Sequence, residues 1–144
     1  MGIVRLVNTS FFDGSRLSSK VDKLSDAVRQ LPQIMVSPKH DIFGGMYART
    51  GLIPAGSTFI GAVHKKDHIN IVVGDVTVLT DDGPLRLTGY HVLPTQAGSK
   101  RVAHTHADTM WTTIIKTDLT DVEAIEDDVV ENSDSLQTRT LKVT

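Results

Sequence analysis

The stretch Gly56-Ser57-Thr58-Phe59-Ile60-Gly61-Ala62-Val63-His64-Lys65-Lys66-Asp67-His68 opens the part of the chain that decides the fold. It continues through residues 69–79 and closes at His104-Thr105-His106. Short β-branched runs alternate with turn residues, and five of the six histidines lie between residues 64 and 106. Short strands at this spacing predict a sandwich or a barrel. Imidazoles and cations on facing strands suggest a pocket for a small molecule.

Further strands extend this β pattern on both sides. The runs that predict strands are residues 46–49, 58–63, 69–73, 76–80, 85–87, 90–93, 100–106 and 111–115. Between two of them, Asp81-Asp82-Gly83-Pro84 predicts the turn of a hairpin. The expected fold is mainly β, with a barrel over residues 41–118.

One helix is expected before the barrel. Val21, Leu24, Val28 and Leu31 form a single apolar stripe, and Pro32 ends the helix. We expect this helix and a short strand over residues 2–7 to pack on the barrel as an N-terminal part, residues 1–40.

A second helix is expected after the barrel. Thr120 and Glu123 have the spacing of a capping box, and an apolar stripe predicts a helix to about residue 132. The stripe consists of Val122, Ile125 and Val129, and the expected outer face is acidic, with Glu123, Glu126, Asp127, Asp128 and Glu131. The polar tail contains a candidate edge strand over residues 138–143. Residues 119–144 complete what we expect to be one domain.

Composition excludes several classes of function. The chain has 144 residues, 40% of them hydrophobic, and a net charge of -2, which does not suit bulk nucleic-acid binding. It has no cysteine, so it has neither disulfides nor thiolate metal ligands. No apolar run reaches the roughly 20 residues of a membrane span, and the N-terminus lacks a signal-peptide pattern. These features predict a cytoplasmic protein that does not bind a membrane.

Residues 51–115 resemble the cupin superfamily of small jelly-roll β-barrels. Asp67 lies seven positions before Gly74, which is the spacing between the acidic residue and the glycine in the first cupin motif. The paired histidines of that motif are absent, and His64 lies displaced from their places. The second motif corresponds to the longer turn Pro94-Thr95-Gln96-Ala97-Gly98, with His104 further on. The resemblance implies a cupin-like jelly roll without the usual set of metal ligands.

A second resemblance, over residues 31–130, is to small cupin-like proteins of tailed bacteriophages whose role is uncharacterised. Seven short motifs in order carry it. They are residues 31–33, 46–49, 53–56, 64–65, 67–70, 98–101 and 108–113. The resemblance implies a phage-encoded protein in the cytoplasm of the host cell. Since cupin-like proteins commonly associate, we expect at least a homodimer through the N-terminal strand and helix.

Cations near the predicted pocket suggest an anionic ligand. Lys65, Lys66, Lys100 and Arg101 would give one rim of the barrel up to four positive charges, which suits phosphate or carboxylate. The other candidate ligand-binding residues are Asp67, His106, Trp111 and Thr113. Three alternatives stay open. They are solvated lysines, a core position for Trp111, and ion pairs of Lys100 and Arg101 with the acidic helix.

Three histidines are candidates for catalysis. His64, His68 and His104 could act as general acid and base on a phosphodiester, which would make the protein a histidine-based nucleotide hydrolase. His104 and His106 lie two residues apart on one strand, so both imidazoles should face the same side. With His64 or His68 they could bind a divalent metal, although no metal ligand is assigned and no other cofactor is expected.

The leading hypothesis is a phage accessory protein whose pocket binds an anionic small molecule, with cleavage of that molecule as an open alternative to binding alone. A nucleotide fits best, and a signalling nucleotide of host defence is the working candidate. Two alternatives stay open. One is a structural component of the virion or of its assembly, and the other is a metal-dependent cupin enzyme, an isomerase or oxygenase.

Overall fold

The computed structural model describes residue 23, residues 36–80 and residues 82–140. The N-terminal strand and, apart from Lys23, the N-terminal helix expected from the sequence lie outside these residues. Among the described helices, none is long and apolar enough to cross a membrane.

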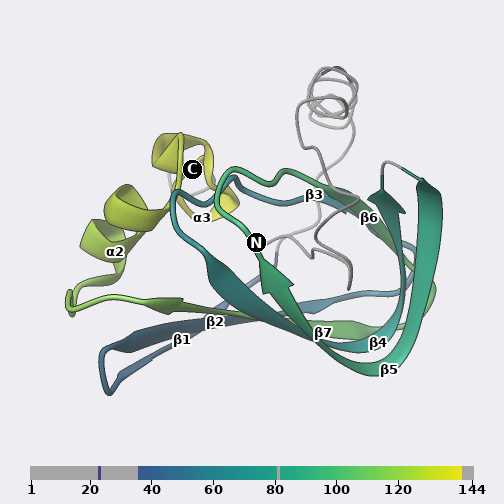
Figure 1. Cartoon of the computed structure of the whole chain (residues 1–144), viewed down its shortest axis with the longest axis horizontal. Helices are drawn as coiled ribbons and strands as arrows, with labels where there is room; N and C mark the ends of the chain where they lie inside the picture. The colour runs from purple at the N-terminus through teal and green to yellow at the C-terminus, as the bar shows by residue number, and fades with distance from the viewer. Residues whose placement is uncertain (1–22, 24–35, 81, 141–144) are drawn as a thin grey trace.

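Seven antiparallel strands form one strongly curled sheet (Figure 1). They are β1 (Lys39–Phe43), β2 (Met46–Ile53), β3 (Thr58–Ile60), β4 (His68–Thr80), β5 (Gly83–Thr95), β6 (Val102–Thr105) and β7 (Thr109–Lys116). Their order is β1-β2-β7-β4-β6-β3, and β5 pairs with β4. The prediction of a mainly β fold is confirmed, and the sheet is a half-barrel. The predicted hairpin turn joins β4 to β5, and both strands continue through positions where the sequence suggested breaks.

Strand β4 belongs to both layers of the half-barrel. Residues 69–73 pair with β7, whereas residues 76–78 pair with β6. The strand bends between these halves at Gly74, whose φ is +152°. A Cβ on Gly74 would lie 2.4 Å from Thr109 Oγ1, so only glycine lets β7 approach this closely. We call β1, β2, β7, residues 69–73 of β4 and residues 90–94 of β5 the lower layer.

The concave side of the half-barrel holds the core. Alternate residues of β4 point inward, including Val72, Val76 and Val78, and they pack around Trp111 and Leu93. A second cluster joins the lower layer to the C-terminal helices. It consists of Tyr47, Ile115, Ile125, Val129, Val130 and Leu136.

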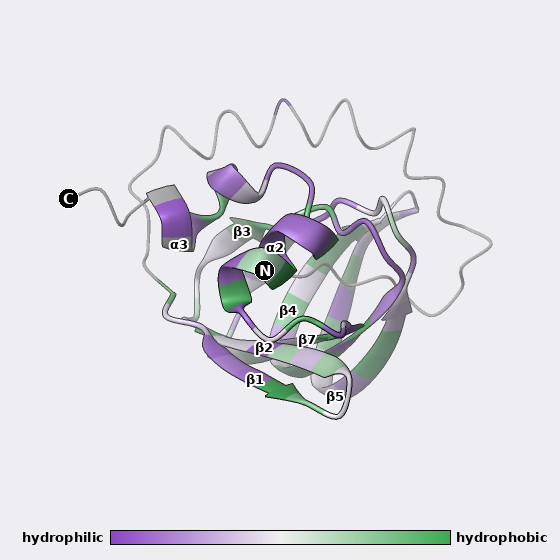
Figure 2. Cartoon of the chain, turned by 90° about the vertical axis from the view of Figure 1, so that its left-hand side faces the viewer, coloured by the Kyte–Doolittle hydropathy of each residue, from purple (hydrophilic) through white to green (hydrophobic). Residues whose placement is uncertain are grey.

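The C-terminal segment closes one end of the half-barrel. It contains α2 (Val122–Val129), the short 3₁₀ helix η2 (Ser133–Ser135) and α3 (Gln137–Thr140). Figure 1 shows α2 at the end opposite the curled side formed by β4 and β5, and Figure 2, viewed from that end, shows α2 in front of the strands.

The structure corrects three details of the predicted C-terminal part. The N-cap of α2 is Asp121 rather than Thr120, because the Asp121 carboxylate accepts from Ala124 N at 3.0 Å. Glu126 is not on the solvated acidic face but is only 4% exposed. Residues 137–140, where an edge strand was a candidate, form a helix. Val122, Ile125 and Val129 do face inward, as the apolar stripe predicted.

Candidate functional site

Two buried imidazoles lie against each other where the segment after β3 enters β4. His64 and His68 are each 6% exposed, and their ring centroids are 4.3 Å apart with a tilt of 37°. His68 is the first residue of β4, on the strand face that also carries Val72 and Val76. The pair therefore belongs to the concave interior.

Contacts on two sides hold the backbone around His64. The carbonyl of His64 accepts from Gly98 N, at 2.8 Å, in the loop after β5. On the other side, Lys65 N donates to Val129 O at 2.7 Å and Glu131 N donates to Val63 O at 2.9 Å. The histidine segment is thus fixed between the β5–β6 loop and the end of α2.

Each imidazole has a buried nitrogen with no hydrogen-bond partner among the described residues. In His68, Nδ1 lies 3.0 Å from the carbonyl of Lys66, so Nδ1 carries the proton and Nε2 is left as an acceptor. In His64 the unpartnered atom is Nδ1.

Burial keeps both rings neutral at neutral pH. Desolvation, with a smaller contribution from His68, lowers the pKa of His64 to about 3. Burial is also the main cause that lowers the pKa of His68. The pair therefore presents two neutral rings, each with an unmatched buried nitrogen, and an unmatched buried polar atom costs about 1–3 kcal/mol.

The polar side chains around Asn70, in contrast, hydrogen-bond to one another. Asn70 is completely buried and links three side chains of the interior. Its Oδ1 accepts from Trp111 Nε1 at 3.1 Å and from Thr113 Oγ1 at 2.7 Å, and its Nδ2 donates to Thr95 Oγ1 at 2.9 Å. Trp111 also meets Phe59 edge to face, with centroids 5.2 Å apart. Trp111 is thus a core residue, and the Thr113 hydroxyl is engaged within the protein.

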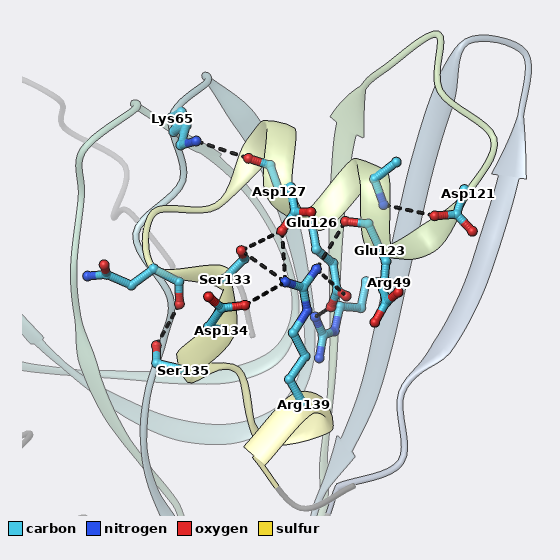
Figure 3. Close-up of polar contacts among 12 residues, drawn as sticks. Arg49, Lys65, Asp121, Glu123, Glu126, Asp127, Ser133, Asp134, Ser135 and Arg139 are labelled. Carbon is cyan, nitrogen blue, oxygen red and sulfur yellow. Dashed lines mark hydrogen bonds and ion pairs between the residues drawn. The ribbon is translucent and has the colours of Figure 1, made fainter.

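A buried ion cluster lies between the sheet and the C-terminal helices (Figure 3). Glu126 lies 3.1 Å from Arg49 Nη1 and 3.5 Å from Arg139 Nη2. The three side chains are 5%, 12% and 14% exposed, respectively. Arg49 also lowers the pKa of His64 through its charge, and Arg49 Nε is a buried donor with no partner among the described residues. The charge of Arg49 therefore acts on His64.

Sequence reasoning did not find this cluster, although a signal was present. Glu126 follows Val122 by four positions and precedes Val129 by three, which places it on the inward face of α2. The sequence around Arg49 and Arg139 gave no comparable signal, because the fold decides which carboxylate each arginine pairs with.

The predicted cationic rim is arranged differently from the expectation. Lys65 and Lys66 are exposed and reach α2, where Lys65 Nζ donates to Asp127 O at 3.0 Å and Lys66 Nζ pairs with Asp128 at 2.7 Å. The Asp67 carboxylate accepts from Ala97 N at 2.8 Å, which ties the histidine segment to the β5–β6 loop. The two lysines thus pair with the acidic helix, a role that the sequence suggested for Lys100 and Arg101.

Arg101 enters the interior instead of the rim. It is 2% exposed, whereas the neighbouring Lys100 is half-buried. The carbonyl of Arg101 accepts from Gly61 N at 3.1 Å, three residues before His64. Arg101 therefore adds a buried cation to the strands next to the histidine segment.

His104 and His106 lie apart from the buried pair. Both are exposed, with ring centroids 5.4 Å apart, and they hydrogen-bond to Thr58 and Thr77 at 2.8 and 2.6 Å. His104 is the register partner of Thr77, whose neighbours Val76 and Val78 point into the core. His104 thus occupies the opposite face of the sheet from His68. The structure brings two of the three candidate catalytic histidines together but not the third.

The metal chemistry usual in cupin-like folds needs a set of ligands. Among the described residues, no three or more of His, Cys, Asp and Glu are grouped to hold a metal ion. His64 and His68 alone do not supply such a set, so no metal-dependent step is derived for this chain. The chemistry that the pair offers is acceptance of hydrogen bonds from a donor on a bound molecule.

No protein-family model matches the sequence, and no curated protein is similar to it. Among solved structures, the fold is similar to a cupin-2 domain protein from Shewanella frigidimarina (14% identity, 69% of this chain and 98% of that one, TM-score 0.46). It is also similar to a cupin superfamily protein from Desulfitobacterium hafniense (13%, 61% and 83%, TM-score 0.48). A third similar structure is ectoine synthase from P. lautus (14%, 70% and 78%, TM-score 0.49). These similarities concern the fold, and the phage resemblance stays a prediction.

Proposed function

We propose that the concave side of the half-barrel binds a small molecule that carries both hydrogen-bond donors and an anionic group. A nucleotide combines these features, since its base or sugar offers N–H or O–H donors and its phosphate is anionic. The phage resemblance extends the proposal to a nucleotide signal of host defence, which the protein would sequester.

The unmatched nitrogens of the histidine pair are the observation that carries this proposal. His64 Nδ1 and His68 Nε2 lie in an interior where Asn70 and its partners satisfy one another. Buried polar groups are normally paired, so two adjacent exceptions mark a place where another molecule completes the hydrogen bonding. Because His68 Nε2 is an acceptor, that molecule must supply a donor.

Two arginines suit the anionic part of such a ligand. Arg49 has an unmatched Nε, and Glu126, which pairs with it, also lies 3.5 Å from Arg139. Arg101 is a second buried cation, on the segment bonded to Gly61. Guanidinium groups bind phosphate with directed hydrogen bonds, and burial strengthens them.

Entry of the ligand requires the C-terminal segment to move. The His64 segment bonds directly to the end of α2, and both histidines are buried. We therefore propose binding with transient opening of α2. Cleavage is not part of this proposal, because His104 lies on the other face of the sheet from the pair.

A thermal-shift titration with a panel of nucleotides tests the proposal. A ligand that binds only the folded protein raises the melting temperature with concentration, by about 2.7 kcal/mol of stabilisation at 100 times its Kd. We expect this response for at least one nucleotide in the wild type, and its loss in His64→Phe.

The His64→Phe variant also shows whether a loss of binding comes from the missing imidazole or from damage to the fold. Replacing a ring that has an unmatched buried nitrogen by an apolar ring of similar shape should leave the melting temperature of the free protein unchanged or higher. His104→Gln, on the opposite face, is the matched control and should bind as the wild type does. A panel without any response, or an equal response in His64→Phe, would refute the proposal.

A further inference from the structure

The convex face of the lower layer is apolar over most of its width. Residues of this face alternate with the inward residues of the same strands. One row crosses four strands through Leu52, Met110, Val73 and Tyr90, which are register partners in turn. We call this surface the outer face.

Two further rows continue the outer face along the strands. The second row is Thr50, Thr112, Ile71 and Val92, and the third is Ala48, Ile114, Ile69 and Pro94. Phe43 and Met46 pair across β1 and β2 and extend the apolar surface at one corner. None of the twelve residues in the three rows carries a charge.

The exposed apolar area is large for a chain of this size. Eight side chains of the outer face are 42% to 86% exposed: Phe43, Met46, Leu52, Ile69, Val73, Tyr90, Val92 and Met110. Taking about 200 Å² for each large side chain, these fractions correspond to roughly 900 Å² of accessible surface. Apolar patches on monomeric proteins usually reach only about 300–600 Å². A stable dimer buries about 800 Å² on each partner, so this area suffices for one.

The charge distribution points to a partner with an equally neutral face. Lys39 and Asp41 on β1 border the rows, and they form an ion pair with each other at 3.3 Å. Lys116 on β7 is the register partner of Met46. An apolar centre with a charged rim is the usual anatomy of a protein interface. The neutral centre of the outer face does not attract nucleic acid or an anionic ligand, whereas the outer face of a second copy is an equally neutral surface.

We propose that two copies of this chain associate through their outer faces. Twisted sheets of the same hand pack face to face at about 10 Å, with strand directions within about 30° of each other. A two-fold axis through the face makes the contact self-complementary and closed. The concave site of each copy stays on the far side of its own sheet, so the interface covers neither site.

Light scattering on size-separated full-length protein tests this assignment. We expect the wild type at twice the chain mass of 15.7 kDa. Met110→Lys places a charge in the middle of the interface on both copies, and should weaken the dimer at least about tenfold. Leu119→Lys is the matched control, since Leu119 is 41% exposed, close to the 47% of Met110, but lies outside the outer face. This control should remain dimeric.

A wild-type mass of one chain at every concentration overturns the proposal. A dimer that persists in folded Met110→Lys overturns it as well, because association would then use another surface.

A second measurement avoids any doubt about folding of the lysine variant. The chain has no cysteine, so Val92→Cys introduces a single thiol on the outer face. A thiol reagent should modify it at least about tenfold more slowly at protein concentrations that favour the dimer than at high dilution. Leu119→Cys should react at the same rate at both concentrations. Equal rates for Val92→Cys would contradict the proposal.

Discussion

Buried polar residues of the concave interior differ in whether their hydrogen bonds are made within the protein. The side-chain oxygen and the amide nitrogen of Asn70 both form hydrogen bonds to neighbouring side chains, and these bonds hold Trp111 and Thr113 in place. His64, a few residues earlier, keeps one nitrogen unmatched. Asn70 on β4 therefore stabilises the core a short distance along the chain from two imidazoles that each keep an unmatched buried nitrogen.

The pH dependence of stability should report the burial of His64. Its pKa in the folded protein, about 3, lies below the ordinary value of 6.5, so the unfolded chain binds a proton first as the pH falls. The free energy of unfolding should decrease below pH 6.5, by up to about 1.4 kcal/mol per pH unit for one histidine. His68 and His40 are shifted in the same direction and add to this loss.

Urea denaturation between pH 7 and pH 5 measures this slope. His64→Phe should reduce it, whereas His104→Gln should keep the slope of the wild type. The window stays above the range where Asp75 and Asp127 titrate, because hydrogen bonds from Arg86 and from Ser133 lower their pKa values. An unchanged slope in His64→Phe would show that His64 is not buried as a neutral group.

At the scale of elements, α2 attaches to the sheet by one buried carboxylate as well as by apolar contacts. Glu126→Gln would remove the carboxylate that pairs with Arg49, whereas Arg139 would keep its ion pairs with Asp127 and Asp134. Breaking a buried ion pair in this way costs about 3–5 kcal/mol. We therefore expect a lower free energy of unfolding and faster hydrogen exchange at the amides of α2.

Asp128→Asn is the matched control for this prediction. Asp128 is on the same helix and pairs with Lys66, but both side chains are 44% exposed. Exposed pairs contribute about 0–1 kcal/mol, so this variant should behave nearly as the wild type. Similar losses in the two variants would mean that the Glu126 cluster is no more than a surface contact.

At the scale of the whole molecule, the two layers of the half-barrel depend on the bend at Gly74. Gly74→Ala would bring a methyl group to 2.8 Å from the Cα of Thr109, in backbone that cannot easily retreat. We expect a loss of about 2–5 kcal/mol, measured by chemical denaturation. Gly89→Ala is the control, since Gly89 pairs with Gly74 and has a φ of +80° but faces open space. Its loss should be only about 1–2 kcal/mol, and a loss as large as that of Gly74→Ala would contradict the steric argument.

The architecture was largely predictable from the sequence, because alternating apolar residues and turn residues act locally. The hairpin around residues 81–84 and the apolar stripe of α2 are examples. The site was predictable only in part. His64 and His68 share one short segment, so their proximity follows from the sequence, whereas His104 required the register of β6 on β4. The Arg49–Glu126 pair joins residues 77 positions apart, and no local pattern could reveal it.

The place of β7 between β2 and β4 also affects how the chain folds during synthesis. β2 leaves the ribosome early, but one of its edges has no neighbour until β7 has been made, after the intervening residues 54–108. At 5–20 residues per second this delay lasts roughly 3–11 s. During that time the nascent chain exposes an open strand edge beside the apolar side chains of Leu52 and Met46, which makes it a substrate for chaperones that act on the ribosome.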